Sequence, residues 1–209
     1  MTPAKRREQL LRATIVAINR TGFRQLKMED FVRIMPASRS TVYRYFPARE
    51  AVITAVVDEY VDYVQQLRLP DTVGNWVSGF SQLLNQAISL NGYLSPVFLD
   101  DLAYEAPTEA QRLRATLQRY FQREAEYYQA GQRAGIFNAQ NVRLWQLQDR
   151  TLLPKLLDPQ VLAGERLTVT NALRDYAAMK RYQVLRPAYV DQVDEHALDA
   201  TLTNIMRYY

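Results

Sequence analysis

Arginine and hydroxyl-bearing side chains are concentrated in one short stretch, from Phe31 to Phe46, which reads FVRIMPASRSTVYRYF. An arginine can donate two hydrogen bonds to the edge of a guanine base, while hydroxyl groups and further cations bind phosphate oxygens. These residue types therefore favour non-covalent recognition of a nucleic acid. The alternative is an arginine-rich helix face that is exposed to solvent and binds nothing.

The charge of the chain is distributed unevenly. The first fifty residues contain eleven Lys or Arg and four Asp or Glu, a net charge of +7, whereas the remainder contains 15 basic and 18 acidic residues, a net charge of −3. A basic end is expected when one part of a protein binds a polyanion and the other does not. A solvated basic surface is the alternative.

Residues suited to catalysis are scarce. The sequence contains one histidine, His196, and no cysteine, and it has no glycine-rich phosphate loop and no pair of histidines at metal-binding spacing. Asp100 and Asp101 are adjacent acids, but neighbouring helical residues point in different directions, which favours a solvated helix end over a catalytic pair. We therefore expect no enzymatic activity and no metal or other cofactor.

The elements that position these residues are predicted to be helices throughout. Apolar residues recur at helical spacing, and the sequence has no sustained apolar–polar alternation and no Asn-Gly or Asp-Gly hairpin signal. The predicted fold class is all-α. The expected helices are Pro3 to Thr21, 28–35, 39–45, a long helix from near Pro47 to before Pro70, 71–90, 96–105, 108–133, 139–157, 165–186 and 194–208.

Two of these helices, 28–35 and 39–45, are separated only by Pro36-Ala37-Ser38. Two short helices joined by a three- to four-residue turn are typical of a helix-turn-helix, whose second helix enters the major groove of DNA. We predict a three-helix DNA-binding domain over residues 1–47 and a helical ligand-binding and dimerisation domain over residues 48–209. An ordinary helical hairpin is the alternative.

The segment from Arg7 to Val57, about a quarter of the chain, carries a set of residues in a characteristic order and spacing. They are Leu11, Ala17, Gly22-Phe23, Phe31-Val32, Ser38, Thr41-Val42-Tyr43-Arg44-Tyr45-Phe46 and Arg49-Glu50. In these residues the segment resembles the DNA-binding domain of the tetracycline-repressor (TetR) family of transcription regulators. After this segment the resemblance is weak.

The resemblance implies roles for individual residues of the second helix. It makes Arg39, Ser40 and Arg44 the base readers, leaves Val42 and Phe46 facing inward, and assigns phosphate contacts to Thr41, Tyr43, Tyr45 and Arg49, with Lys27 as a further backbone contact. Two departures stand out. Pro36 lies in a turn where the family often has glycine, so the turn must differ locally, and Leu26-Lys27 stands where the family often has a capping hydroxyl.

The family's second domain binds a small molecule and pairs two subunits. The aromatic candidates for the ligand pocket are Trp76, Phe80, Tyr93, Phe98, Tyr104, Tyr120, Phe121 and Tyr127, for each of which packing in the core is the alternative. The candidates for the dimer interface, at three- and four-residue spacing, are Val142, Trp145, Leu152, Leu156, Val169, Ala172, Tyr176 and Met179, with intramolecular packing as the alternative.

The sequence is therefore identified as a homodimeric, DNA-binding transcription regulator. The resemblance implies a repressor that an unknown small-molecule effector releases from an inverted-repeat operator. The alternatives are an activator or co-repressor-dependent regulator, and a ligand-binding helical protein whose DNA-binding head has degenerated. The absence of cysteine, of a signal-peptide pattern and of a long apolar run predicts a cytoplasmic protein with no membrane contact.

Overall fold

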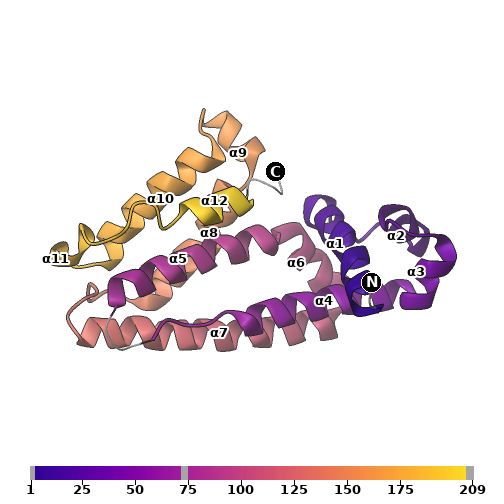
Figure 1. Cartoon of the computed structure of the whole chain (residues 1–209), viewed down its shortest axis with the longest axis horizontal. Helices are drawn as coiled ribbons and strands as arrows, with labels where there is room; N and C mark the ends of the chain where they lie inside the picture. The colour runs from indigo at the N-terminus through magenta and orange to yellow at the C-terminus, as the bar shows by residue number, and fades with distance from the viewer. Residues whose placement is uncertain (1–2, 72–74, 206–209) are drawn as a thin grey trace. The chain divides into compact units, whose positions relative to one another are not determined.

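The computed structural model describes residues 3–71 and 75–205, and their regular elements are helices, with one isolated antiparallel bridge between Phe137 and Leu185. The predicted all-α class is confirmed. None of the described helices is both long and apolar enough to cross a membrane. The helices in Figure 1 are α1 (Pro3–Thr21), α2 (Met28–Ile34), α3 (Arg39–Tyr45), α4 (Arg49–Gln66), α5 (Trp76–Tyr93), α6 (Pro96–Glu105), α7 (Pro107–Arg133), α8 (Val142–Leu156), α9 (Pro159–Gly164), α10 (Val169–Val184), α11 (Pro187–Val190) and α12 (Asp199–Ile205).

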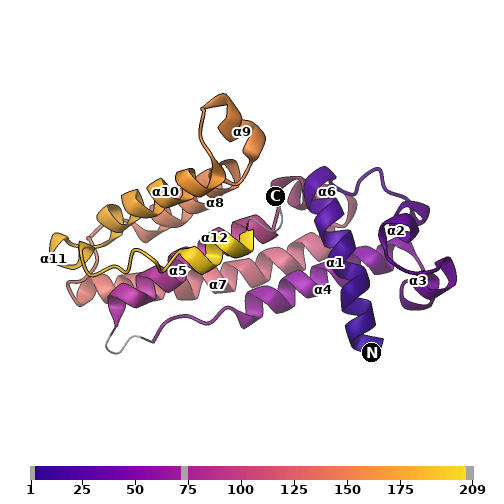
Figure 2. The same cartoon turned by 45° about the horizontal axis from the view of Figure 1, so that its top comes forward.

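The chain forms two compact units. Unit 1 comprises Met1–Gln66 and Leu94–Leu117, and unit 2 comprises Leu67–Tyr93 and Gln118–Tyr209. Unit 1 therefore contains α1 to α4, α6 and the first part of α7, while unit 2 contains α5, the rest of α7 and α8 to α12. Within unit 1, α2 and α3 lie side by side in both views (Figures 1 and 2).

Unit 1 is built around α1, which packs against α2, α4 and α6. Leu11, Ile15 and Ile18 of α1 are buried, as their spacing predicts. The hydroxyl of Tyr60 in α4 donates to Oδ1 of Asn19 in α1 at 3.0 Å, and its ring lies 4.9 Å from that of Phe98 in α6. The aromatic core of unit 1 thus joins α1, α4 and α6.

Unit 2 has an aromatic core around the end of α7. The rings of Tyr127, Tyr128 and Phe137 lie 5.5–6.0 Å from one another, and that of Trp145 in α8 lies 5.4 Å from Tyr128. A Cβ atom added at Gly131 would lie 2.2 Å from the ring of Phe137, so only glycine allows the chain after α7 to fold back onto the helix here.

A buried polar cluster connects α7, α8 and α10 within unit 2. Nε2 of Gln146 donates to Oε2 of Glu124 at 2.8 Å, and Nζ of Lys180 donates to Oδ1 of Asp149 at 2.8 Å. The Tyr176 hydroxyl also donates to Asp149. Burial raises the pKa of Glu124 to about 7. Because a buried charge is costly without its partner, the Lys180–Asp149 pair favours one register of α10 on α8.

Helix boundaries differ from the predicted ones chiefly near α10. The predicted helix over 165–186 begins at Val169, because the Thr168 side chain accepts a hydrogen bond from the amide of Asn171 and caps the helix there. The residues before it form the separate helix α9, which follows the N-cap Asp158. The predicted helix over 194–208 begins at Asp199, and its last residues lie outside the described ranges.

Candidate nucleic-acid interface

Helix α3 is fixed at its start by Ser38. The side-chain oxygen of Ser38 accepts a hydrogen bond from the amide of Thr41 at 3.3 Å and lies 2.9 Å from the Thr41 hydroxyl. Val42 and Phe46 are buried, as predicted, and hold the opposite side of the helix against the rest of unit 1. The cap and the buried pair together present the remaining side chains of α3 outward.

The outward side chains of α3 group in pairs of arginine and tyrosine. Arg39, Ser40 and Arg44 are exposed, and the guanidinium of Arg39 lies 5.3 Å from the centre of the Tyr43 ring. That of Arg44 lies 5.4 Å from the ring of Tyr45. Thr41, Tyr43 and Tyr45 are half-buried. Six of the predicted DNA contacts thus lie on one short helix.

The turn between α2 and α3 is made without a left-handed residue. Among the described residues, positive φ angles occur only at Gly22, Gly135 and Arg166. In the turn, the amide of Ala37 donates to the Met35 carbonyl at 2.8 Å. Arg6 of α1 donates to the carbonyl of Pro36 at 2.8 Å, which ties the turn to α1. The turn therefore requires no positive φ angle and is compatible with the fixed φ of Pro36.

The start of α2 compensates for the absent capping hydroxyl. The carboxylate of Asp30 accepts a hydrogen bond from the backbone amide of Lys27 at 2.8 Å. That bond is the main cause that lowers the pKa of Asp30. The side chain of Lys27 is exposed and lies at the N-terminus of α2. Its ammonium group is therefore accessible for the predicted contact with a DNA backbone.

Arg49, a predicted phosphate contact, is bonded to the backbone between α1 and α2. Its Nε donates to the carbonyl of Leu26 at 2.8 Å and its Nη2 to the carbonyl of Phe23 at 3.1 Å, with Glu105 3.4 Å from Nη2. The side chain is only 22% exposed. In this structure Arg49 therefore holds the backbone between α1 and α2, and its contact with phosphate stays a prediction.

Asp101 holds the same segment from α6. Its Oδ2 accepts hydrogen bonds from the amides of Phe23 at 2.6 Å and Arg24 at 2.9 Å. Gly22 ends α1 with φ +75°, and a Cβ atom there would lie 2.3 Å from that oxygen. The prediction of a solvated helix end is therefore wrong for Asp101, while Asp100 is exposed but lies in the interior of α6 and not at its end.

Solved structures similar to this chain are transcription regulators. One from Saccharomonospora viridis, in complex with choline, is 18% identical over 88% of this chain and 99% of that chain, with a TM-score of 0.62. A putative TetR-family regulator from Rhodococcus sp. is 16% identical over 96% and 99%, with a TM-score of 0.60. TylP, a TetR regulator from Streptomyces fradiae, is 16% identical over 100% and 99%, also at 0.60. The chain has the TetR-family fold. No protein-family model and no curated protein matches the sequence.

In this TetR-type fold the aromatic residues predicted to form a ligand pocket do not meet at one site. Phe98 and Tyr104 belong to unit 1, where Phe98 is core and Tyr104 is 67% exposed, with Arg24 3.6 Å from its ring centre. Phe80 lines a cavity of unit 2. The remaining five, Trp76, Tyr93, Tyr120, Phe121 and Tyr127, lie in unit 2, where Trp76 packs 5.1 Å from Tyr127 and the Tyr120 hydroxyl donates to Gln86 at 2.9 Å.

Most residues predicted for a dimer interface of this TetR-type fold are core of the single chain. Those buried in unit 2 are Val142, Trp145, Val169, Ala172 and Tyr176, while Leu152 and Leu156 pack against that core. The five buried residues are therefore not surface available to a second subunit, whereas Leu152 and Leu156 are half-buried. Met179, in contrast, is exposed. The sequence analysis missed three further exposed apolar residues, Leu144, Leu147 and Tyr182. It missed them because each of these helices carries apolar residues on two faces, of which only one is buried.

Replacing Arg49 tests its position between α1 and α2. Arg49→Ala removes charge-assisted bonds to two carbonyls and should lower the free energy of unfolding by about 2 kcal/mol. The matched control is Arg44→Ala, which removes an exposed arginine and should change that free energy by less than about 0.5 kcal/mol. Urea unfolding followed by circular dichroism measures both. Equal losses from the two substitutions would contradict the assignment.

Proposed function

We propose that the chain is a DNA-binding transcription regulator and that residues 1–47 are its DNA-binding domain. The observation that carries the proposal is the exposed side of α3, which offers two arginines and several hydroxyls on a capped helix. The net charge of +7 in the first fifty residues supports it, because phosphate neutralisation supplies much of the affinity for DNA. Likeness in fold to TetR regulators supports it as well.

The proposed roles follow the exposure of each side chain. Arg39, Ser40 and Arg44 read base edges, since they are the exposed residues of α3 among the candidates. Thr41, Tyr43, Tyr45 and Lys27 bind phosphate and set the register of the helix in the groove. Arg49 is a positioning residue, because its guanidinium is bonded to the carbonyls of Phe23 and Leu26.

Binding should be specific, dimeric and sensitive to salt. The affinity of the full chain for its preferred inverted repeat should fall with salt at a logarithmic slope of about −0.9 per phosphate neutralised. Arg44→Ala should cost about 1–3 kcal/mol on that sequence and little on random duplexes. Sequence selection followed by fluorescence anisotropy provides the measurement. An affinity that does not change between low and high salt would rule out the proposed function.

We further propose that the regulator is a homodimer and that the exposed sides of α8 and α10 form its interface. Two recognition helices must be held about 34–36 Å apart to bind half-sites one helical turn apart. In unit 2, α8 packs against α10. Each helix carries two exposed apolar residues at i, i+3 spacing, Leu144 and Leu147 on α8 and Met179 and Tyr182 on α10. Clustered exposed apolar residues are typical of an interface.

A charge on this apolar surface should separate the subunits. Leu147→Glu combined with Met179→Glu should convert a dimer to a monomer, because two carboxylates would lose their hydration in the interface. The control is Leu167→Glu, at another exposed apolar residue, which lies between α9 and α10 and should leave the dimer intact. Light scattering after size exclusion reports the mass. A wild-type monomer, or a double variant that stays dimeric, would contradict the interface.

Release from DNA by a small molecule is the third part of the proposal. One structure of similar fold is a complex with choline, which supports a small-molecule site in this fold. A ligand releases DNA only if it binds more tightly to the conformation that DNA does not bind. Coupling of about 1–3 kcal/mol would weaken operator binding by roughly 5- to 150-fold.

Reciprocity tests the release mechanism. The operator must weaken the affinity for the effector by the same factor by which the effector weakens the affinity for the operator. Calorimetric titration of an effector into the protein, with and without operator DNA, measures this factor. Equal affinities refute release by that ligand, and tighter binding in the presence of operator indicates a co-repressor or activator instead.

A further inference from the structure

The buried polar cluster of unit 2 contains two acids and one buried cation. It joins Glu124 of α7 to Gln146 and Asp149 of α8 and to Tyr176 and Lys180 of α10. Within the described part of the chain, Glu124 and Lys180 are the charged residues that are buried, at 4% and 2% exposed. A buried charge is costly unless an opposite charge balances it, so the charges of this cluster can be counted against one another.

The lysine is engaged by one of the two acids. Nζ of Lys180 donates to Oδ1 of Asp149 at 2.8 Å and to the carbonyl of Trp145 at 3.1 Å. The hydroxyl of Tyr176 donates to the same carboxylate. Asp149 therefore balances the charge of Lys180.

Glu124 has an uncharged donor instead. Its Oε2 accepts a hydrogen bond from Nε2 of Gln146 at 2.8 Å, and that nitrogen also donates to the carbonyl of Phe121 at 2.7 Å. Oε1 of Gln146 accepts from Nη1 of Arg143 at 3.2 Å, so the orientation of the amide is fixed. Because an amide does not cancel a carboxylate charge, an ionised Glu124 would leave the cluster with one negative charge in excess.

The other charged and titratable groups that face Glu124 do not supply a second buried cation. Arg143 and Arg150 of α8 are exposed, and the guanidinium of Arg150 lies 5.0 Å from the centre of the Phe121 ring. Tyr128 lies one turn further along α7 and is buried. Burial raises the pKa of Tyr128 well above its ordinary value, so this tyrosine carries no charge near neutral pH.

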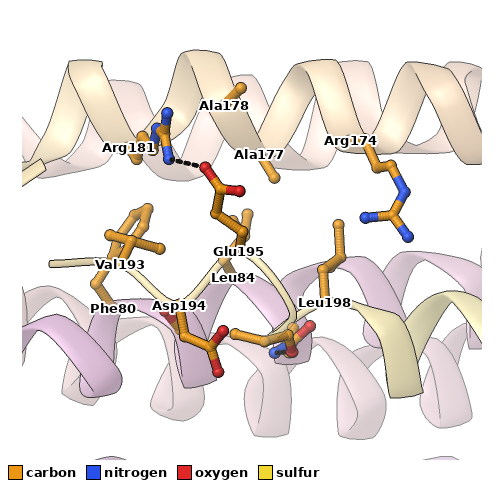
Figure 3. A pocket seen from close by; sticks show the side chains of 13 residues that line it. Phe80, Leu84, Arg174, Ala177, Ala178, Arg181, Val193, Asp194, Glu195 and Leu198 are labelled. Carbon is orange, nitrogen blue, oxygen red and sulfur yellow. Dashed lines mark hydrogen bonds and ion pairs between the residues drawn. The ribbon is translucent and has the colours of Figure 1, made fainter. Parts of the chain in front are cut away.

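The cavity of unit 2 does not bring water to the cluster. This cavity lies between α5, α10 and the segment that precedes α12, and Arg174, Ala177 and Arg181 form its α10 side (Figure 3). None of the cluster residues lines it. Tyr176 and Lys180 thus belong to another side of α10.

The excess charge acts on the protonation of Glu124. Burial raises the pKa of this carboxyl from its ordinary value of 4.5 to about 7, although the hydrogen bond from Gln146 opposes the change. Between these two values the folded chain keeps a proton that the unfolded chain has lost. The free energy of unfolding therefore falls as the pH rises through this interval, and above it Glu124 causes no further change.

We propose that the cluster is a pH-sensitive switch: α8 and α10 pack tightly on α7 while Glu124 is protonated, and this packing weakens when Glu124 ionises. The charge acts on both helices, because Gln146 of α8 meets Glu124 directly and the Lys180–Asp149 pair joins α8 to α10. The switch goes beyond the proposed function, and it requires neither DNA nor a ligand.

Carbon-13 NMR of the full chain, with labelled glutamate side chains, follows the proton directly. One glutamate carboxyl should titrate with a midpoint at about pH 7. Glu124→Gln should remove this titration. The matched control is Glu126→Gln, at an exposed glutamate two residues further along α7, which should keep it. Asp149→Asn should lower the midpoint, because Lys180 can then balance Glu124.

Urea unfolding at about pH 5 and about pH 8 measures the effect on packing. Relative to Glu124→Gln at the same protein concentration, the folding equilibrium constant of the wild type should fall by roughly 10- to 100-fold from the lower to the higher pH. Glu126→Gln should follow the wild type.

Three results would each overturn the inference. They are the absence of a glutamate that titrates at about pH 7, an Asp149→Asn variant in which the midpoint stays or rises, and equal pH dependence of unfolding in Glu124→Gln and Glu126→Gln. DNA binding by a chain that fails these tests would leave the proposed function intact.

Discussion

The orientation of the candidate DNA-binding helices depends on how the backbone between α1 and α2 is held. Asp101 accepts hydrogen bonds from the amides of Phe23 and Arg24, and Arg49 donates to the carbonyls of Phe23 and Leu26. Both the donors and the acceptors of this segment are therefore paired with charged side chains, which form stronger bonds than neutral ones. Since α2 follows directly and α3 follows one turn later, this pairing fixes the start of the whole helix-turn-helix.

The features of unit 1 that could be predicted from the sequence are local ones. The range 39–45 is the observed range of α3, and the burial of Val42 and Phe46 follows from spacing within one helix. The roles of Arg49 and Asp101 could not be predicted, because their partners are 23 to 78 positions away. The local sequence around an arginine is the same whether its side chain contacts a phosphate or a distant backbone carbonyl, so it does not distinguish the two roles.

In unit 2 the periodicity predicted the helices but not which of their apolar sides is buried. Trp145 is buried while its neighbour Leu144 is exposed, and Lys180 is buried while Met179 is exposed. A lysine is expected at the surface, and the sequence does not show that Asp149, from another helix, neutralises it. The cavity was missed for a related reason, since its polar residues come from α5, α10 and the segment before α12, far apart in the chain.

Unit 1 is discontinuous in the chain, and this has a consequence for biosynthesis. A nascent polypeptide that has emerged only as far as α4 already contains α1, α2 and α3, but it lacks Asp101 and Glu105. The amides of Phe23 and Arg24 then have water as their partner, and the rings of Phe23 and Tyr60 lack Phe98. The helix-turn-helix leaves the ribosome before α6, but it can reach its final packing only after α6 has followed it.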